Sequence, residues 1–408
     1  MPDNTSKLTR RRFLTTAAGG LVSASLLNLT PAKTLAQESA EEGDVAEGNI
    51  IHRTLGRTGL NVPIVSMGVM NASNPEIVQA SYEIGIRHFD TAAYYQFGRN
   101  EQMVGSVINR LKARDKIVLG TKIHTPGQRR GLQPEESKKK LIEACEASLR
   151  RLGTDYLDIL YVHDVSDPET VADKAIIEGL EILKEQKKVL YTGIATHTRM
   201  NEVIDAVVNG GFYDVVLTAI NFTMADNTAL LESISKAAAQ GVAIVAMKAL
   251  AGGARWPNPQ VRQNYTSSTI ATAALKWVLR NESIATSIPG YTNYEHMQED
   301  FSVARNLEYT PEEKKLLSDN NVKLSLGYCH QCRECLASCP EGVDIPNLMR
   351  THMYAAQYGN FHQARATLND IPNSAGLRLC SECSSCQAQC ANTVDIAHRI
   401  DELKMIYC

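Results

Sequence analysis

The sequence lacks several features that would place this chain in common classes. No apolar run reaches the roughly 20 residues that a membrane-spanning helix needs, so no such helix is predicted. The net charge is −3 and no basic stripe appears outside the N-terminus, which argues against nucleic acid as a partner. The first 328 residues hold one cysteine, Cys145, so no disulfide framework is spread along the chain. The composition, 44% hydrophobic and 21% charged, is that of an ordinary globular protein, and 408 residues are long enough for one large domain and one small domain.

Cysteine is instead concentrated at the C-terminus, in two runs of identical spacing. Each run has the form C-x2-C-x2-C-x3-C, which is the ligand pattern of two [4Fe–4S] clusters. In this pattern the fourth cysteine of each run characteristically ligates the other cluster. The repeat extends further, because Val343-Asp344-Ile345 is echoed by Val394-Asp395-Ile396. The predicted metal ligands are Cys329, Cys332, Cys335, Cys339, Cys380, Cys383, Cys386 and Cys390.

Disulfides and zinc are the alternative interpretations of these runs. Structural zinc takes four ligands as two separated pairs, which a run of four does not resemble. The second copy departs from the pattern at Ala391, where the first has Pro340. Cys145 and Cys408 fall outside the runs. We expect Cys145 to be a buried small side chain and Cys408 to be a solvated thiol.

The N-terminal residues are predicted to stand apart from the fold. Arg10, Arg11 and Arg12 precede a mild apolar stretch, and Thr34-Leu35-Ala36 offers small residues for cleavage. This resembles a twin-arginine (Tat) export signal over residues 1–36, followed by a linker at 37–50. It implies the Tat translocase as a transient partner and a periplasmic or extracytoplasmic location. A basic amphipathic helix is the alternative.

Between the two ends, β-rich apolar runs alternate with segments of helical period. Eight such units in about 270 residues indicate a (β/α)8 TIM barrel, predicted here over residues 51–322. A doubly wound open sheet is the alternative, but no G-x-G-x-x-G follows the first strand. A hairpin around Gly56–Gly59 is expected to cover the barrel bottom. The expected strands are Pro63–Gly68, Ile86–Thr91, Ile117–Lys122, Leu157–His163, Leu190–Ala195, Val215–Asn221, Val242–Met247 and Ile284–Pro289, and helices are expected at Glu135–Leu152, Thr170–Lys188 and Thr269–Arg280.

Polar residues arrive at the C-terminal ends of consecutive predicted strands. Asp90, Lys122 and His163 end the second, third and fourth strands, and Tyr95 lies in the loop after Asp90. Singly each has a structural explanation, but together they suit proton transfer to a carbonyl as hydride arrives. Tyr95 is the expected acid, Lys122 the cation expected to lower its pKa, and Asp90 the partner of Lys122. His163 is expected to orient the substrate oxygen.

At these residues the chain resembles the aldo-keto reductases. The matching stretches include Phe89–Tyr95, Gly120-Thr121-Lys122 and Leu152–Asp158, together with Arg53–Leu60 and Ser287–Gly290. The resemblance implies a TIM barrel that reduces a carbonyl, or oxidises an alcohol or sugar, with NADP or NAD. The tail, residues 323–408, looks like a mainly α-helical ferredoxin-type domain, with helix expected at 347–368.

The resemblance also implies positions that hold the dinucleotide, and here the chain departs from the family's pattern. Leu217 stands where the family has a glutamine that helps to hold the nicotinamide, and Met247 stands where it has a tyrosine that stacks on the nicotinamide ring. Gly290 and His296 stand at positions of the family's cationic clamp for the 2′-phosphate. NAD and NADP therefore both remain open. The implied cofactor-binding residues are Thr196, Met247, Lys248, Leu250, Gly252, Gly290, Glu299 and Asp300.

Two functional classes follow. The first is an NAD(P)-dependent oxidoreductase with appended clusters that transfer electrons or brace the structure. The second is an iron–sulfur electron-transfer or binding protein whose barrel is catalytically inactive. For the first, the expected partners are a small carbonyl or alcohol substrate and a redox protein or quinone pool.

Overall fold

The structure is a computed structural model that describes residues 49–124, 133–252 and 259–408. These residues belong to one compact unit. The predicted export signal lies outside the described residues, and so does the predicted linker except for its last two positions. Both therefore stay predictions.

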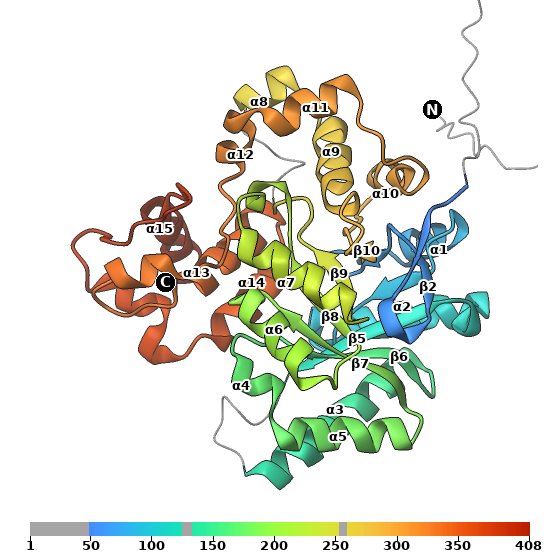
Figure 1. The fold of residues 1–408 in the computed structure, drawn as a ribbon. Helices are drawn as coiled ribbons and strands as arrows, with labels where there is room; N and C mark the ends of the chain where they lie inside the picture. The colour runs from blue at the N-terminus through green and yellow to red at the C-terminus, as the bar shows by residue number, and fades with distance from the viewer. Residues whose placement is uncertain (1–48, 125–132, 253–258) are drawn as a thin grey trace, which may run out of the picture. The chain divides into compact units, whose positions relative to one another are not determined.

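Eight parallel strands form the centre of the molecule, and their order in the sheet follows the chain (Figure 1). Parallel bridges from Val65 to Ser287 and from Gly68 to Gly290 join the first strand to the last. The sheet is thereby closed into the predicted (β/α)8 barrel. The strands are β3 (Met67–Gly68), β4 (His88–Asp90), β5 (Val118–His124), β6 (Leu157–His163), β7 (Val189–Thr196), β8 (Val215–Ala219), β9 (Ala243–Met247) and β10 (Thr286–Ser287).

Helices between the strands cover the outside of the barrel. In α3 a proline opens the helix and Gly153, at φ 63°, ends it, while Leu141, Cys145 and Leu149 are buried. One expected helix, Thr170–Lys188, is two, because Asp173 caps a new helix with its side chain. The barrel helices are α1 (Pro75–Glu83), α2 (Arg99–Leu111), α3 (Pro134–Leu152), α4 (Pro168–Val171), α5 (Lys174–Glu185), α6 (Met200–Gly210), α7 (Thr228–Ala239), α8 (Pro259–Asn264), α9 (Ser267–Leu279) and α10 (Tyr294–Ser302).

The expected hairpin is present before the first barrel strand. Strands β1 (His52–Thr54) and β2 (Asn61–Pro63) pair antiparallel. The Arg57 backbone N–H between them donates to the Gly241 carbonyl, just before β9. The hairpin therefore lies at the N-terminal end of the barrel, away from the rim where Asp90 and His163 end their strands.

The tail is helical, as predicted, and has its own apolar core. Val343 and Ile345 pack in this core with Val394 and Ile396. The repeated Val-Asp-Ile motif is thus a repeated helix start, in which Asp344 caps α13 and Asp395 caps α15. The helices after the barrel are α11 (Pro311–Ser318), α12 (Asn320–Leu326), α13 (Ile345–His352), α14 (Phe361–Asp370) and α15 (Ile396–Tyr407), and a π-helical turn η7 (Met353–Gln357) follows α13.

Polar contacts attach the tail to the C-terminal rim of the barrel. Arg350 of α13 forms an ion pair with Asp164, next to His163. The Thr198 hydroxyl, just after β7, donates to Gln331 Oε1 at 3.2 Å. Figure 1 shows α13 and α14, in orange and red, beside the barrel. The predicted ferredoxin-type segment is therefore part of the wall around the barrel mouth.

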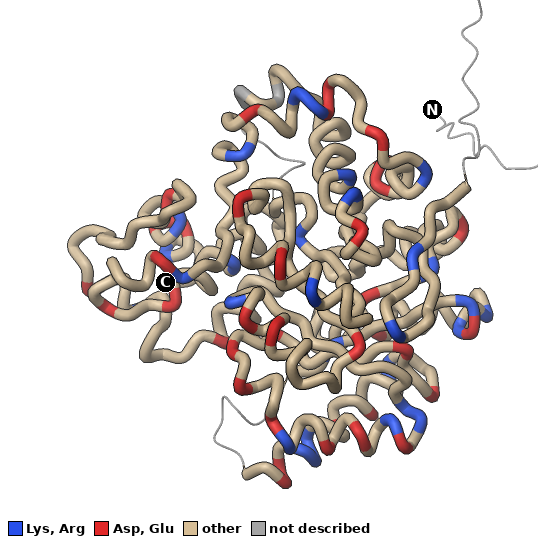
Figure 2. The backbone as a smooth tube through the Cα atoms, viewed as in Figure 1, with Lys and Arg blue, Asp and Glu red and all other residues tan. Residues whose placement is uncertain are grey.

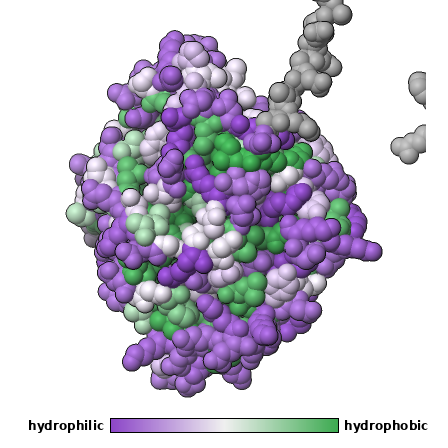
Figure 3. Space-filling model, turned by 45° about the vertical axis from the view of Figure 1, so that its right-hand side comes forward, coloured by the Kyte–Doolittle hydropathy of each residue, from purple (hydrophilic) through white to green (hydrophobic). Residues whose placement is uncertain are grey.

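The surface carries charges of both signs. Lysine and arginine alternate with aspartate and glutamate along the described helices (Figure 2). On the face in Figure 3, hydrophilic residues predominate and smaller apolar areas lie between them. Among the described residues, no helix is long and apolar enough to cross a bilayer.

Candidate functional site

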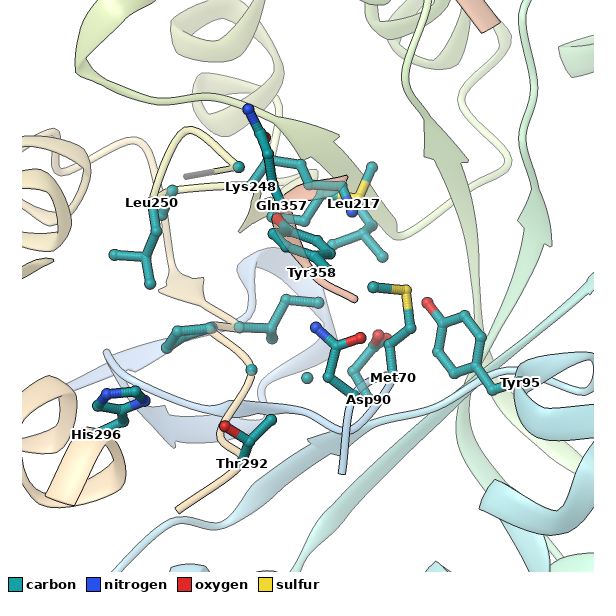
Figure 4. Close-up of a pocket in the computed structure, with 18 of the residues that line it drawn as sticks. Met70, Asp90, Tyr95, Leu217, Lys248, Leu250, Thr292, His296, Gln357 and Tyr358 are labelled. Atoms are coloured by element: carbon teal, nitrogen blue, oxygen red, sulfur yellow. The ribbon is translucent and has the colours of Figure 1, made fainter. Parts of the chain in front are cut away.

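A cavity of about 220 Å³ opens at the C-terminal ends of the barrel strands. Side chains from β4, β5, β8 and β9 line it together with two residues of the tail (Figure 4). Its lining residues are Gly68, Met70, Asn71, Asp90, Tyr95, Lys122, Leu217, Met247, Lys248, Ala249, Leu250, Gly252, Ile288, Pro289, Gly290, Thr292, His296, Gln357 and Tyr358.

Three of the four predicted catalytic residues meet in this cavity. The Lys122 ammonium donates to Asp90 Oδ1 and to the Thr91 carbonyl, the latter at 2.7 Å. It also lies 5.2 Å from the centre of the Tyr95 ring. Asp90 and Lys122 share this place because β4 and β5 are neighbours and Asp90 pairs with Gly120, two positions before Lys122.

Burial governs the protonation of this group. It raises the pKa of Asp90 and lowers the pKa of Lys122, and their mutual attraction opposes both shifts. Burial, together with the nearby Asp90 and Tyr354, raises the pKa of Tyr95 well above its ordinary value. The net shift of this pKa is upward, whereas the sequence predicted that Lys122 would lower it, because burial is the largest cause and the ammonium is directed to Asp90. The Tyr95 phenol keeps its proton at neutral pH and is a donor.

His163 occupies its predicted position at the end of β6, but it does not line the cavity. Its Nε2 is 2.7 Å from the hydroxyl of Tyr94, whose ring meets that of Tyr95 edge-on at 5.0 Å. Burial, with His124 nearby, lowers the pKa of His163 well below its usual value, so the imidazole is neutral. Tyr94 therefore links His163 to Tyr95. This role of Tyr94 was not predicted, since nothing in the sequence distinguishes the two adjacent tyrosines by orientation.

The predicted cofactor-binding residues divide into two groups. Met247, Lys248, Leu250, Gly252 and Gly290 line the cavity. The other three do not: Thr196 is buried at the end of β7 and donates to the Thr198 carbonyl at 3.1 Å, while Glu299 and Asp300 belong to α10. Thr292 and His296 line the cavity near Gly290, at the end where the resemblance places the adenosine.

The tail supplies cavity residues that the sequence analysis did not find. Gln357 and Tyr358 lie at the end of η7, and a Cβ on Gly252 would stand 2.6 Å from Gln357 Oε1. The glycine, at φ 71°, thus permits the close approach of barrel loop and tail. The only available signal was helical period in the tail, which does not say which face meets the barrel.

Eight of the nine tail cysteines form two sets, each around a cavity. Cys329, Cys332 and Cys335 of the first run share one cavity with Cys390 of the second. Another cavity, of about 330 Å³, is lined by Cys339 together with Cys380, Cys383 and Cys386. This exchange of the fourth cysteine agrees with the arrangement expected for two-cluster ferredoxins.

The donor sets fit iron–sulfur clusters better than single ions. Among the described residues, no group of three His, Cys, Asp or Glu side chains is close enough to hold one metal ion. Burial and the neighbouring thiols raise the pKa of Cys329 to about 12, and burial is the main cause that raises the pKa of Cys380 to about 11. Partly buried thiols that line a shared cavity suit a group whose iron stabilises the thiolate form. Cys145 is buried and Cys408 exposed, as expected of cysteines outside the two sets.

Comparisons with known proteins agree with this geometry. A model of the aldo/keto reductase family matches residues 66–265, and a model of the 4Fe-4S dicluster domain matches residues 294–395. L-galactose dehydrogenase of Arabidopsis thaliana is 26% identical over 301 residues, covering 65% of this chain and 92% of that protein. L-glyceraldehyde 3-phosphate reductase of Escherichia coli O157:H7 is 24% identical over 324 residues, covering 65% of this chain and 91% of that protein.

A solved structure supports the fold. The holo form of an aldo-keto reductase from Bacillus halodurans superposes with a TM-score of 0.54 at 23% identity, covering 66% of this chain and 95% of that one. The matches indicate an oxidoreductase. The chain carries an aldo/keto reductase domain followed by a 4Fe-4S dicluster domain.

Proposed function

We propose that the protein is an NAD(P)-dependent oxidoreductase that reduces a small carbonyl compound or oxidises the corresponding alcohol or sugar. One observation carries the proposal. The protonated phenol of Tyr95 and the Asp90–Lys122 pair line the same cavity at the barrel rim. A phenol that keeps its proton can donate it to a carbonyl oxygen when the phenolate left behind is stabilised.

The chain's own residues have distinct roles in this reaction. Tyr95 donates its proton to the substrate oxygen, and Lys122, held by Asp90, stabilises the phenolate that remains. Met247, Leu250 and Gly290 offer surface for the dinucleotide, which supplies the hydride when bound. Met247 can contact a ring through its sulfur, whereas Leu217 can make no hydrogen bond.

For the clusters we propose one of two roles: they either brace the tail over the cavity or transfer electrons. A narrow second cavity is lined by Lys248 and Gln357 and also by Cys329, so the first cysteine set lies beside the reductase cavity. Hydride carries two electrons and each cluster takes one, so exchange requires a flavin or quinone relay. A redox protein or a quinone pool is the proposed partner. Paramagnetic resonance after addition of NADH or NADPH, with and without an added flavin or quinone, distinguishes the roles, because only electron transfer reduces the clusters.

The proposed location is outside the cytoplasm, after export by the Tat translocase. It rests on the arginine-rich N-terminus and on the cysteine sets, since a clustered protein must be folded before export. We propose that the dinucleotide is bound before export. Mass analysis of protein purified from its native compartment tests this, and the absence of a co-purifying dinucleotide contradicts it.

Substitution of Tyr95 by phenylalanine tests the reductase function. Tyr95→Phe removes only the proton donor, so carbonyl reduction should be lost while NAD(P)H still binds. Tyr156→Phe is the matched control, because Tyr156 precedes β6 at the opposite end of the barrel. Turnover that survives Tyr95→Phe contradicts the assignment.

A second function is favoured by one observation at His163. The Nε2 that would orient a substrate oxygen contacts the Tyr94 hydroxyl. An electron-transfer or binding protein with an inactive barrel is consistent with this contact and with Leu217. Such a protein would bind ligands in the cavity and show no carbonyl reduction by the wild-type chain.

A further inference from the structure

The charges around the reductase cavity do not cancel. Asp90 and Lys122 neutralise one another as an ion pair. Lys248 also lines the cavity, and among the described residues its ammonium has no acidic partner. The cavity therefore carries an excess positive charge beside the proposed proton donor.

Lys248 is held in place by aromatic residues of the tail. Its Nζ donates to the Tyr354 hydroxyl at 3.1 Å and lies 4.5 Å from the centre of that ring. The ring of Tyr358 is 5.4 Å from the same nitrogen. Cation–π contacts and one neutral acceptor fix the ammonium without cancelling its charge. Two of its three N–H donors remain for a ligand.

The backbone contributes to this placement. Lys248 follows β9 directly and has φ 59°, in the left-handed region that lysine rarely adopts. Tyr354 is 4% exposed, so its hydroxyl is fixed by packing. Tyr354 is also near enough to contribute to the raised pKa of Tyr95. The lysine and the proton donor thus border one space.

The position of Lys248 distinguishes two anions, the adenosine phosphate of NADP and an acidic group of the substrate. In Figure 4, Thr292 and His296 lie together at one side of the cavity, and Lys248 lies with Gln357 and Tyr358 at another. The resemblance places the adenosine phosphate near Gly290 and His296. The Lys248 ammonium therefore lies on the side of the cavity that the tail lines, and not on the side where the adenosine phosphate is expected.

We propose that Lys248, positioned by Tyr354 of the iron–sulfur domain, binds the carboxylate of a substrate that carries both an acidic group and the reacting carbonyl, such as a keto acid. The inference rests on the proposed reductase function. It gives the tail a role in substrate choice, because a barrel without Tyr354 and Tyr358 would leave Lys248 unsupported.

The test measures binding, so it is independent of turnover. Pyruvate and phenylpyruvate, each compared with its methyl ester, are titrated into the full-length holoprotein with NAD+ or NADP+ present. A charge-assisted contact should favour each acid over its ester by about tenfold or more. Lys248→Met should bring the two affinities within about twofold of one another, while Lys248→Arg should keep the preference for the acid.

Two further variants complete the experiment. Tyr354→Phe should weaken the acid preference without removing it, because the ring stays and the hydroxyl is lost. Lys236→Met is the matched control, since Lys236 is on α7 and pairs with Asp205. It should leave every dissociation constant unchanged.

Several results would overturn the proposal. One is equal affinity of wild-type protein for acid and ester, or no binding of either acid. Another is a Lys248→Met variant that keeps the acid preference and loses affinity for NADP+, since Lys248 then holds the cofactor phosphate. Loss of turnover in Tyr95→Phe with no acid preference in wild-type protein would uphold the reductase function and refute this inference alone.

Discussion

Arg350 of the tail and Asp164 of the barrel form a buried bidentate ion pair. The two guanidinium nitrogens are 2.7 and 2.8 Å from the two carboxylate oxygens, and each side chain is 7% exposed. Burial alone would raise the pKa of Asp164, but the charge and hydrogen bonds of Arg350 outweigh it and hold that pKa well below its usual value. Since Asp164 follows His163 and Arg350 belongs to α13, the pair joins the C-terminal rim of the barrel to the 4Fe-4S dicluster domain.

Removal of one partner of this pair should destabilise the protein strongly. Asp164→Asn leaves the arginine buried without its counter-charge, so we expect a loss of about 3–5 kcal/mol in the free energy of unfolding. Chemical denaturation followed by the visible absorbance of the clusters measures it. Asp401→Asn is the control, because its partner Lys404 forms an exposed pair worth at most about 1 kcal/mol. A loss no larger than the control's would contradict the prediction.

The same pair should make stability depend on acid pH. The folded-state pKa of Asp164 lies below the unfolded value of about 4, so the pair stabilises the fold above that pH. The contribution is lost as pH falls toward the folded-state pKa. The difference in unfolding free energy between wild-type protein and Asp164→Asn should therefore shrink below about pH 4. A constant difference through this range is the contrary result.

The exchange of the fourth cysteines can be tested by iron content. Wild-type protein should hold about eight iron atoms, and Cys390→Ser or Cys329→Ser should each lower this toward about four. The pair Cys390→Ser with Cys329→Ser should lose no more than either alone, because both ligate the first cluster. Cys390→Ser with Cys380→Ser should lose both clusters.

If each cluster used only the cysteines of one run, the iron contents of the two double variants would be exchanged. In that arrangement Cys390 and Cys380 share a cluster, and their double variant would retain about four iron atoms. Cys408→Ser is the control, because this exposed cysteine belongs to neither set. Paramagnetic resonance of the reduced protein should confirm which cluster signal disappears.

Gln331 should raise the reduction potential of the first cluster. Its Nε2 is 3.4 Å from Cys329 Sγ, and an N–H bond to sulfur stabilises the more negative, reduced cluster. Gln331→Met removes the bond, and a loss of about 1 kcal/mol lowers the potential by about 40 mV. A redox titration followed by paramagnetic resonance measures it.

The second run provides a matched control for this substitution. Within the described part of the chain, the Gln387 amide donates to Ser385 and to no sulfur atom, so Gln387→Met should leave both potentials unchanged. An equal shift in both variants would mean that Gln331 acts through general packing. A raised potential in Gln331→Met would contradict the assigned direction.

The raised pKa of Tyr95 predicts the pH profile of carbonyl reduction. The donor must be protonated, so its contribution is present below its pKa and lost above it. We expect the turnover number for reduction to stay level from pH 7 to about 10. A decline with a midpoint at or below about 10 would show that Tyr95 titrates at its ordinary value or lower, against the effect of burial.

Much of the fold and part of the site could be read from local sequence. The eight apolar runs became the barrel strands, because a strand buried on both faces must be apolar along its length. Asp90 and Lys122 were found because strand ends gather at one rim. The cysteine spacing predicted cluster ligands for a similar reason, since three ligands within a few residues need only a local turn.

Tertiary structure decided which of these residues act together. Lys248 meets Tyr354, 106 positions away, only because η7 packs on the barrel mouth. His163 contacts Tyr94, and Lys122 is directed at Asp90, through side-chain orientations that depend on burial. The sequence by itself determined the elements and the chemistry each can offer. Packing of the tail against the rim decided the walls, charge and protonation of the cavity, because these depend on contacts between segments distant in the chain.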